Sequence, residues 1–118
     1  MSITMYGIKN CDTVKKARDW MDVRGVAYVF QDYKLAGVGA ERLKTWCDEL
    51  GWEAVLNRAG VTFRKLTAVD KENLDMGKAM SLMLAQPSLI KRPILDLGSR
   101  RVIGFKPELY REALSENQ

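Results

Sequence analysis

A chain of 118 residues is long enough to form one domain with its own hydrophobic core. Its hydrophobic fraction of 47% and charged fraction of 29% are ordinary for a globular protein, and they argue against a disordered chain or a membrane protein. The net charge of +4 arises from 19 basic residues scattered among 15 acidic ones, a pattern that disfavours nucleic-acid binding and suits a small anionic ligand.

Residue types and motifs that do not occur in the sequence exclude several further classes of chemistry. The chain has no histidine, which rules out Cys-His and Ser-His-Asp catalysis. Only two cysteines are present, Cys11 and Cys47, and they are far apart in sequence, so we expect no metal site. No Walker-type loop or Gly-x-Gly-x-x-Gly fingerprint occurs, so we expect no tightly bound cofactor. Neither a bilayer-length apolar run nor a signal-peptide pattern is present, so we expect a cytoplasmic protein.

The first part of the chain predicts a βαβ unit. A short apolar strand at Ile3–Tyr6 leads through a turn at Gly7 into a helix that begins after Cys11. Gly25 ends this helix, and the β-branched and aromatic segment Val26–Phe30 predicts a second strand. The strand-helix-strand order implies a parallel pair with a right-handed crossover. The apolar face of the helix consists of Val14, Ala17, Trp20 and Met21.

The middle of the chain predicts helices joined by loops. Four apolar residues at helical spacing indicate one buried helix, namely Leu43, Trp46, Cys47 and Leu50. A short turn at Trp52–Leu56 and a loop over residues 57–60 follow, and then a helix at Leu74–Ala85 that Asp75 caps. We expect Cys47 to lie in the core, the alternative being a resolving thiol close to Cys11.

The end of the chain predicts a ββα unit. The segments Ile94–Leu97 and Arg101–Phe105 flank a Gly-Ser-Arg turn and indicate a β-hairpin. Pro107 suits the first position of a final helix. We expect the inner face of that helix to carry Leu109, Ala113 and Leu114.

Cys11 stands where the first strand passes into the first helix, a position that suits a reactive cysteine. The unpaired backbone N–H groups of a helix's first turn and the helix dipole favour the thiolate, which is the nucleophilic form. The neighbouring Lys9 acts in the same direction, whereas the carboxylate of Asp12 opposes it. The alternative interpretation is a small buried hydrophobic residue. The residue three positions later is Val14, so no Cys-x-x-Cys motif exists and an external thiol such as glutathione must release any adduct.

Three segments carry a resemblance to a known family: Asn10-Cys11-Asp12-Thr13, Leu56-Asn57-Arg58 and Ile90-Lys91-Arg92-Pro93-Ile94. With them the chain resembles the ArsC/Spx family, and within it the YffB subgroup, from end to end. The resemblance implies an α/β fold of the thioredoxin-like (glutaredoxin-like) type, with a mixed four-stranded sheet and a helical insert between the βαβ and ββα units. It also implies one ArsC-like domain over residues 1–118, with its thioredoxin-like core at about 1–35 and 87–115 and the insert at about 38–86.

The resemblance also implies a mechanism and a set of site residues. In arsenate reductases of this family a cysteine attacks arsenate, glutathione attacks the adduct, and glutaredoxin completes turnover. Cys11 matches the nucleophile, and Thr13 matches a hydroxyl that can hydrogen-bond the sulfur. Of three arginines that surround the oxyanion, two match Arg58 and Arg92, whereas the third falls on Lys106. A lysine keeps the charge but lacks the planar fork of a guanidinium.

The remaining candidates follow from the same match. Pro93 corresponds to the cis-proline of thioredoxin-like folds. Taken singly, Arg58 and Lys106 are also compatible with ordinary surface charges. The expected binding residues for glutathione or an anionic substrate are Lys9, Asn10, Thr13, Arg58, Arg92, Pro93 and Lys106.

Three functional hypotheses result. The first is a glutathione-dependent thiol reductase with Cys11 as its single catalytic cysteine, glutathione as co-substrate and a small oxyanion or disulfide as substrate. The second is an arsenate reductase that uses glutathione and glutaredoxin, which the lysine at position 106 disfavours. The third is a Spx-like regulator that binds RNA polymerase without turnover, which Val14 disfavours because Spx proteins commonly carry Cys-x-x-Cys at this site. A shared fold does not decide among them.

Overall fold

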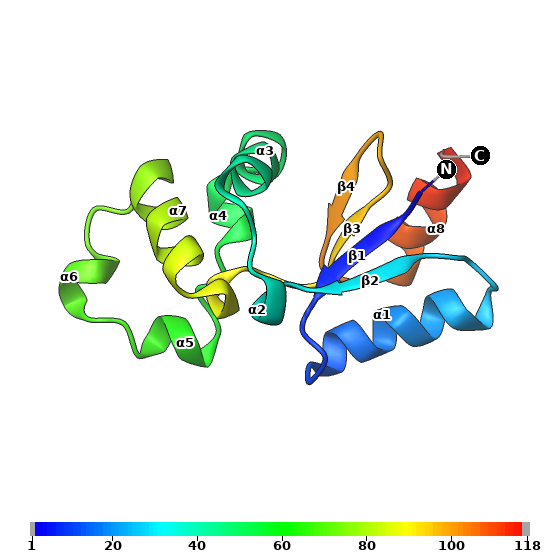
Figure 1. Cartoon of the computed structure of the whole chain (residues 1–118), viewed down its shortest axis with the longest axis horizontal. Coiled ribbons are helices and arrows are strands. Elements are labelled where there is room, and N and C mark those ends of the chain that lie inside the picture. The colour runs from blue at the N-terminus through cyan, green and yellow to red at the C-terminus, as the bar shows by residue number, and fades with distance from the viewer. Residues whose placement is uncertain (1, 117–118) are drawn as a thin grey trace. The chain divides into compact units, whose positions relative to one another are not determined.

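The computed structural model describes residues 2–116, and the chain divides into two compact units (Figure 1). The first unit consists of Met1–Ala36 and Arg92–Gln118, and the second consists of Gly37–Lys91. The second unit is thus an insertion between the two sequence segments that build the first.

The first unit contains a four-stranded mixed sheet. Its strands are β1 (Thr4–Gly7), β2 (Val29–Asp32), β3 (Ile94–Asp96) and β4 (Arg101–Ile103), in the spatial order β2-β1-β3-β4. β1 and β2 are parallel, whereas β3 is antiparallel to both β1 and β4. This arrangement confirms the predicted fold class and the predicted parallel pair and hairpin.

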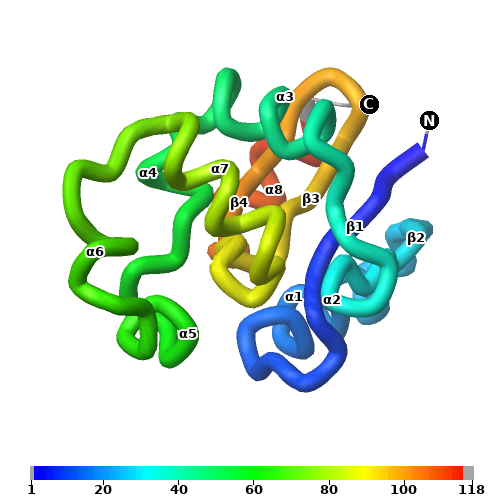
Figure 2. The backbone as a smooth tube through the Cα atoms, turned by 60° about the vertical axis from the view of Figure 1, so that its left-hand side comes forward, coloured from blue at the N-terminus to red at the C-terminus, as the bar shows by residue number. Residues whose placement is uncertain are grey.

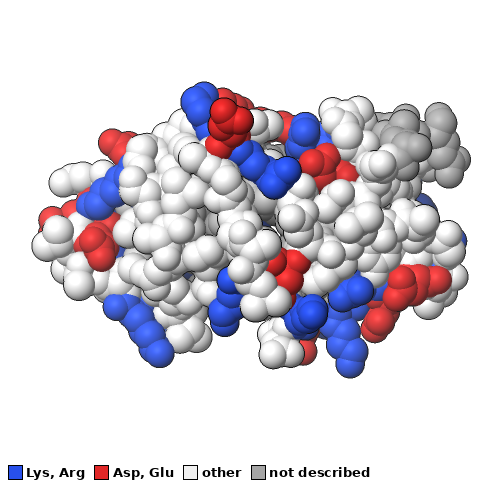
Figure 3. Space-filling model, in the orientation of Figure 1, with Lys and Arg blue, Asp and Glu red and all other residues white. Residues whose placement is uncertain are grey.

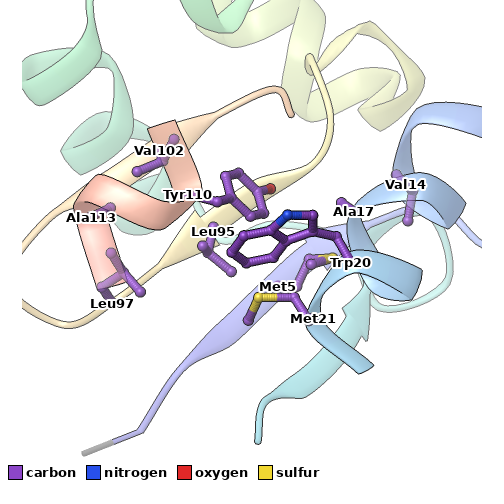
Figure 4. Packing of buried hydrophobic residues seen from close by; sticks show 10 residues of the cluster. All are labelled: Met5, Val14, Ala17, Trp20, Met21, Leu95, Leu97, Val102, Tyr110 and Ala113. Carbon is purple, nitrogen blue, oxygen red and sulfur yellow. The ribbon is translucent and has the colours of Figure 1, made fainter. Parts of the chain in front are cut away.

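Two helices, α1 (Asp12–Val23) and α8 (Pro107–Glu116), pack with the sheet to form the core of the first unit. Met5, Leu95 and Val102 lie opposite one another on adjacent strands and belong to one buried cluster. Figure 4 shows this cluster, to which α1 and α8 contribute Val14, Ala17, Trp20, Met21, Tyr110 and Ala113. Since these strand residues share one face of the sheet, both helices pack on that face.

Two predictions in the first unit are wrong in detail at β1 and β2. The second strand begins at Val29 rather than Val26, because the Val26 N–H bonds the Met21 carbonyl oxygen at the end of α1 at 3.0 Å. Gly7 is the last residue of β1 rather than a turn residue. A Cβ atom at Gly7 would lie 3.1 Å from a methyl group of Val14, so a glycine here allows α1 to approach the strand closely.

The inner face of α8 also differs from the prediction. Leu109 is 38% exposed, whereas Tyr110 is buried and its hydroxyl donates a 3.0 Å hydrogen bond to the Gly104 carbonyl. Ala113 is buried and Leu114 is partly buried, as expected. The buried face of α8 is centred on Tyr110, one residue after Leu109. The aromatic ring of Tyr110 packs edge-on against Trp20, with 5.7 Å between the ring centroids.

The second unit is helical. Its longer helices are α3 (Ala40–Leu50) and α7 (Met76–Ala85), joined by the short helices α4 (Trp52–Val55), α5 (Val61–Arg64) and α6 (Ala68–Lys71) and followed by the 3-10 helix η1 (Pro87–Leu89). The buried stripe of α3 is confirmed at Leu43, Trp46 and Cys47. The predicted cap is confirmed as well, because the Asp75 carboxylate accepts a 2.8 Å hydrogen bond from the Lys78 N–H.

One short helix belongs to the first unit and was absent from the sequence prediction. α2 (Tyr33–Ala36) directly follows β2 and contacts both β1 and β2, as the tube in Figure 2 shows. Its first residue, Tyr33, is fully buried. This element adds a buried polar side chain beside the end of the two parallel strands.

The described surface mixes basic and acidic side chains, as Figure 3 shows for one face of the molecule. This agrees with the alternation of charges in the sequence. None of the helices within residues 2–116 is both long enough and apolar enough to cross a membrane.

Candidate active site

The register of the sheet brings four chain segments to one end of it. Gly7 pairs with Asp32 in the parallel ladder, and Ile94 pairs with Tyr6 and with Ile103 in the antiparallel ladders. The chain therefore leaves β1, β2 and β4 at the same end at which it enters β3. Most of the residues predicted for the site lie in these segments: Lys9, Asn10, Cys11, Thr13, Arg92, Pro93 and Lys106.

Cys11 is the N-cap residue of α1, in the extended conformation that this position requires. Its carbonyl oxygen accepts the first helical hydrogen bond, from the Lys15 N–H at 2.9 Å, while its side chain makes no capping hydrogen bond. The thiol is half-buried. A sulfur here lies at the positive end of a twelve-residue helix, where the first-turn N–H groups lack helical partners.

Asp32 holds the loop that leads to Cys11. Its carboxylate accepts a 3.3 Å hydrogen bond from the backbone N–H of Lys9, and its other oxygen accepts from the N–H of Lys34 at 2.9 Å and of Leu35 at 3.3 Å. The same carboxylate thus fixes the approach to Cys11 and the start of α2. Sequence reasoning missed this role, although an aspartate immediately before a helix is a common helix-start signal.

Tyr33 and Arg92 form a buried polar contact in the first unit. The Tyr33 side chain is fully buried, and it shares a side-chain hydrogen bond with Arg92, in which the guanidinium donates to the phenol oxygen. Burial raises the pKa of Tyr33 above its ordinary value; the Arg92 charge opposes this shift, and the charges of Cys11 and Asp32 add to it. Arg92, Cys11 and Asp32 are therefore electrostatic neighbours of one buried hydroxyl.

Pro93 follows Arg92 and is joined to it by a cis peptide bond, as the family resemblance implies. The Pro93 ring is buried, and its carbonyl oxygen accepts a 2.8 Å hydrogen bond from the Gly104 N–H. This bond ties the start of β3 to the segment after β4, at the end of the sheet that carries Cys11.

Thr13 and Lys106 are exposed at this end of the sheet. Thr13 is the second residue of α1, and Lys106 immediately precedes α8, where its carbonyl oxygen accepts from the N–H groups of Leu109 at 3.0 Å and Tyr110 at 3.1 Å. Both side chains are exposed. A role for either one in binding stays a prediction.

Arg58 and Cys47 both belong to the second unit. Arg58 is exposed, lies 3.6 Å from the Glu53 carboxylate and faces the Trp52 ring at 5.8 Å. Cys47 is 4% exposed on α3, and burial raises the pKa of its thiol, with a smaller contribution from Asp48. The approach of Arg58 to Cys11 stays a prediction, as does any exchange between the two thiols, which are both free.

Possible metal ligands do not cluster in the described part of the chain. Within residues 2–116, no group of three or more cysteine, aspartate or glutamate side chains could hold a metal ion.

Comparison with known proteins identifies the family. The sequence model of the ArsC family matches residues 6–113. The chain belongs to the ArsC family. Two solved structures illustrate the match. One, of a YffB protein, is 58% identical, covers 96% of this chain and 99% of its own, and has a TM-score of 0.93. The other, of an arsenate reductase related protein from Brucella melitensis, is 51% identical, covers 95% and 93% of the two chains, and has a TM-score of 0.78.

ArsC-family relatives also include transcription regulators. The global transcriptional regulator Spx of Streptococcus agalactiae is 30% identical over 114 residues, which cover 95% of this chain and 82% of the relative. The thioredoxin-like fold is therefore shared between proteins named for arsenate reduction and proteins named for transcription control. Membership of the ArsC family fixes the scaffold but does not by itself fix the chemistry.

Proposed function

We propose that this protein is a glutathione-dependent thiol reductase in which Cys11 is the nucleophile. The observation that carries the proposal is the half-buried Cys11 thiol at the N-cap of α1, at the end of the sheet that also carries Arg92. A helix N-terminus favours the thiolate, and a nearby cation favours an anionic group on the molecule under attack. Membership of a family that includes arsenate reductase related proteins supports an oxidoreductase.

The reaction proceeds in two exchange steps. In the first, the Cys11 thiolate attacks one sulfur of a disulfide between glutathione and a second thiol, so that a bond from Cys11 to glutathione forms and the second thiol leaves as a thiolate. In the next, the thiolate of another glutathione molecule attacks the glutathione sulfur of the adduct. Glutathione disulfide leaves, and the Cys11 thiolate is restored.

An external thiol is needed because the first unit supplies no second cysteine. Val14, the residue at the second cysteine position of a Cys-x-x-Cys motif, is 1% exposed and packs in the core against Gly7. The other cysteine of the chain, Cys47, belongs to the second unit and is buried. Arg92 and Lys106 then have the role of holding a carboxylate of glutathione or an anionic substrate.

The test is turnover of a glutathione-peptide disulfide with glutathione as the reductant. We expect the unmodified protein and Cys47→Ser to turn over, and Cys11→Ser to fall to background. Without added glutathione, intact mass should show one glutathione on Cys11, which added glutathione then removes. Turnover by Cys11→Ser, or an adduct that glutathione does not release, would contradict the proposal.

Arsenate reduction is a second candidate, favoured by the 51% identity with an arsenate reductase related protein. In this reaction Arg92 and Lys106 would bind an inorganic oxyanion, rather than the carboxylate of glutathione or an anionic disulfide substrate. A lysine holds an oxyanion as a point charge, without the two parallel hydrogen bonds of a guanidinium. Lys106→Arg should therefore increase arsenate reduction with glutathione and glutaredoxin. No gain would mean that the missing fork is not what limits the reaction.

Regulation of transcription is a third candidate, favoured by the 30% identity with Spx of Streptococcus agalactiae. It predicts retention on immobilised RNA polymerase by a protein with no measurable thiol turnover. The buried position of Val14 weighs against a two-cysteine redox switch at this site. Binding of polymerase that persists in Cys11→Ser, together with absent turnover, would favour the regulator over the reductase.

A further inference from the structure

The fully buried Tyr33 is a polar residue that the proposed reaction has not used. It is the first residue of α2 and directly follows Asp32, the residue that pairs with Gly7 at the end of the parallel strands. Its hydroxyl is at the end of the sheet from which the chain continues to Cys11. Tyrosine hydroxyls that are buried generally have a hydrogen-bond partner, and here the partner is Arg92.

The backbone around Tyr33 is held firmly. The Asp32 carboxylate bonds the N–H groups of Lys34 and Leu35, which closes the first turn of α2 around Tyr33. The same carboxylate bonds the N–H of Lys9 in the loop before Cys11. Two consecutive residues therefore contact two parts of the candidate site. Asp32 binds the loop before Cys11, and Tyr33 binds the guanidinium of Arg92.

The hydrogen bond restricts the orientation of Arg92. A guanidinium is planar and carries its five donors in fixed directions, so a bond from one N–H to the buried phenol oxygen restricts the directions in which the remaining donors can point. Arg92 is held at its backbone as well, because it immediately precedes the buried Pro93 at the start of β3. The side chain and the backbone of Arg92 are thus both fixed at the end of the sheet that carries Cys11.

The phenol is suited to orient the cation and not to exchange protons. Burial raises the pKa of Tyr33 above its ordinary value, so the hydroxyl stays protonated and neutral at physiological pH. A neutral oxygen can accept from the guanidinium without cancelling its charge. A carboxylate in the same place would neutralise Arg92 toward any anion.

We infer that Tyr33 is a positioning residue that holds the Arg92 guanidinium toward the anionic group that Cys11 attacks. The inference rests on the proposed function for the identity of that reaction. It adds that anion preference at Cys11 depends on the buried hydroxyl that is hydrogen-bonded to Arg92. Loss of the hydroxyl should weaken the recognition of anions while leaving the thiol itself in place.

The test compares two alkylating reagents at Cys11 in a Cys47→Ser background. Iodoacetate is an anion and iodoacetamide is its neutral analogue. The rate of alkylation by iodoacetate divided by the rate by iodoacetamide therefore reports the positive charge that an anionic reagent meets beside the Cys11 thiol. We expect Arg92→Ala to lower this ratio by about fivefold, the effect of one charge at close range in a solvated site. Tyr33→Phe should lower the ratio about twofold or more, and it should add nothing in the Arg92→Ala background.

The matched control is Tyr110→Phe. Tyr110 is equally buried in the same unit and its hydroxyl is bonded, but to the Gly104 carbonyl rather than to a guanidinium. We expect this variant to lose similar stability and to keep the alkylation ratio. A drop in the ratio for both tyrosine variants would show a merely structural effect and would overturn the inference, as would an unchanged ratio in Tyr33→Phe.

A further variant keeps the inference testable if Tyr33→Phe does not fold. Arg92→Lys retains the charge but loses the planar fork, and we expect its ratio to fall below that of the unmodified protein. An unchanged ratio in Arg92→Lys would contradict the inference. The proposed function fails separately: altered ratios without any glutathione turnover would leave Tyr33 and Arg92 as an anion site and remove the reductase.

Discussion

The two compact units each carry one free cysteine, and the two thiols differ in their place along a helix. Cys11 of the first unit is the N-cap of α1, half-buried, with no helical turn before it. Cys47 of the second unit lies in the interior of α3, on the stripe formed with Leu43 and Trp46. The Cys11 thiol is therefore partly exposed at the edge of the core of its unit, whereas the Cys47 thiol is buried within the packing of the other.

The position of each cysteine along its helix sets the environment of its thiol. A helix N-terminus offers backbone N–H groups without helical partners, and a helix interior offers none. In the interior, burial acts on the thiol without compensation and raises the pKa of Cys47. The basic residues follow a similar division, because Arg92 is bonded to a buried phenol whereas Arg58 is an exposed residue beside Glu53.

The largest expected contrast is in thiol reactivity. At pH 7 iodoacetamide should alkylate Cys11 at least about tenfold faster than Cys47, since the reactive form is the thiolate and burial disfavours it at Cys47. Burial shifts the pKa of Cys47 upward, so its alkylation should rise only above the ordinary thiol range near pH 8.5. Peptide mass spectrometry after timed quenching measures both sites in one sample. Equal rates at the two sites would break the comparison.

The local signals that identify these positions are readable in the sequence. The strand before Cys11, the stripe around Cys47 and the Asp75 cap each depend on neighbouring residues, and each agrees with the structure. Pro107 likewise begins α8 as its fixed backbone angle suggests. Periodicity over ten residues or more is a strong signal because a whole helix face must be apolar.

The Tyr33–Arg92 contact could not be predicted, because it joins residues that are far apart in sequence and depends on the strand register. α2 has four residues, too few for helical periodicity, as have α5 and α6. Tyr33 therefore had no local pattern to distinguish it from an ordinary strand-end aromatic. The incorrect prediction that Leu109 rather than Tyr110 lies on the buried face of α8 has a similar cause. The Gly104 carbonyl, which accepts the hydrogen bond of the Tyr110 hydroxyl, is identified only by the fold.

Two glycines, Gly7 in the first unit and Gly77 in the second, differ in the space available for a Cβ atom, so alanine substitutions should change the stability in opposite directions. A Cβ at Gly7 would come within 3.1 to 3.3 Å of Val14 and Phe30 side chains, so Gly7→Ala should lower the free energy of unfolding by about 1 to 3 kcal/mol through overpacking. In the second unit, a Cβ at Gly77 would meet only the Asp75 carboxylate at an ordinary 3.7 Å. Gly77→Ala should therefore raise stability, by about 0.5 kcal/mol, since alanine is the better helix former.

Urea unfolding followed by circular dichroism measures both glycine variants. Opposite signs are expected, and the unmodified protein serves as the reference for each. A stable Gly7→Ala protein would mean that α1 can shift away from β1 at little cost. In that case the close approach would not be what requires glycine at this position.

The second unit has one helix cap whose contribution can be isolated. Asp75→Ala removes the 2.8 Å hydrogen bond to the Lys78 N–H and should cost about 1 kcal/mol in the free energy of unfolding. Asp75→Ser keeps a capping oxygen and should cost much less. Urea unfolding of the two variants separates the cap from the general effect of the substitution. An equal loss in both would mean that the charge, rather than the cap, is what stabilises α7.

The corresponding change in the first unit should act in the opposite direction. Cys11 occupies the N-cap of α1 without a side-chain capping bond, and serine is among the best residues for that position. Cys11→Ser should therefore raise the free energy of unfolding by about 0.5 kcal/mol while it removes thiol turnover. The matched control is Cys47→Ser, which places a hydroxyl in the α3 core and should lower stability while leaving turnover intact. A gain in stability together with a loss of turnover would favour a chemical role for the Cys11 thiol, whereas a loss of stability in Cys11→Ser would indicate that the thiol contributes to packing.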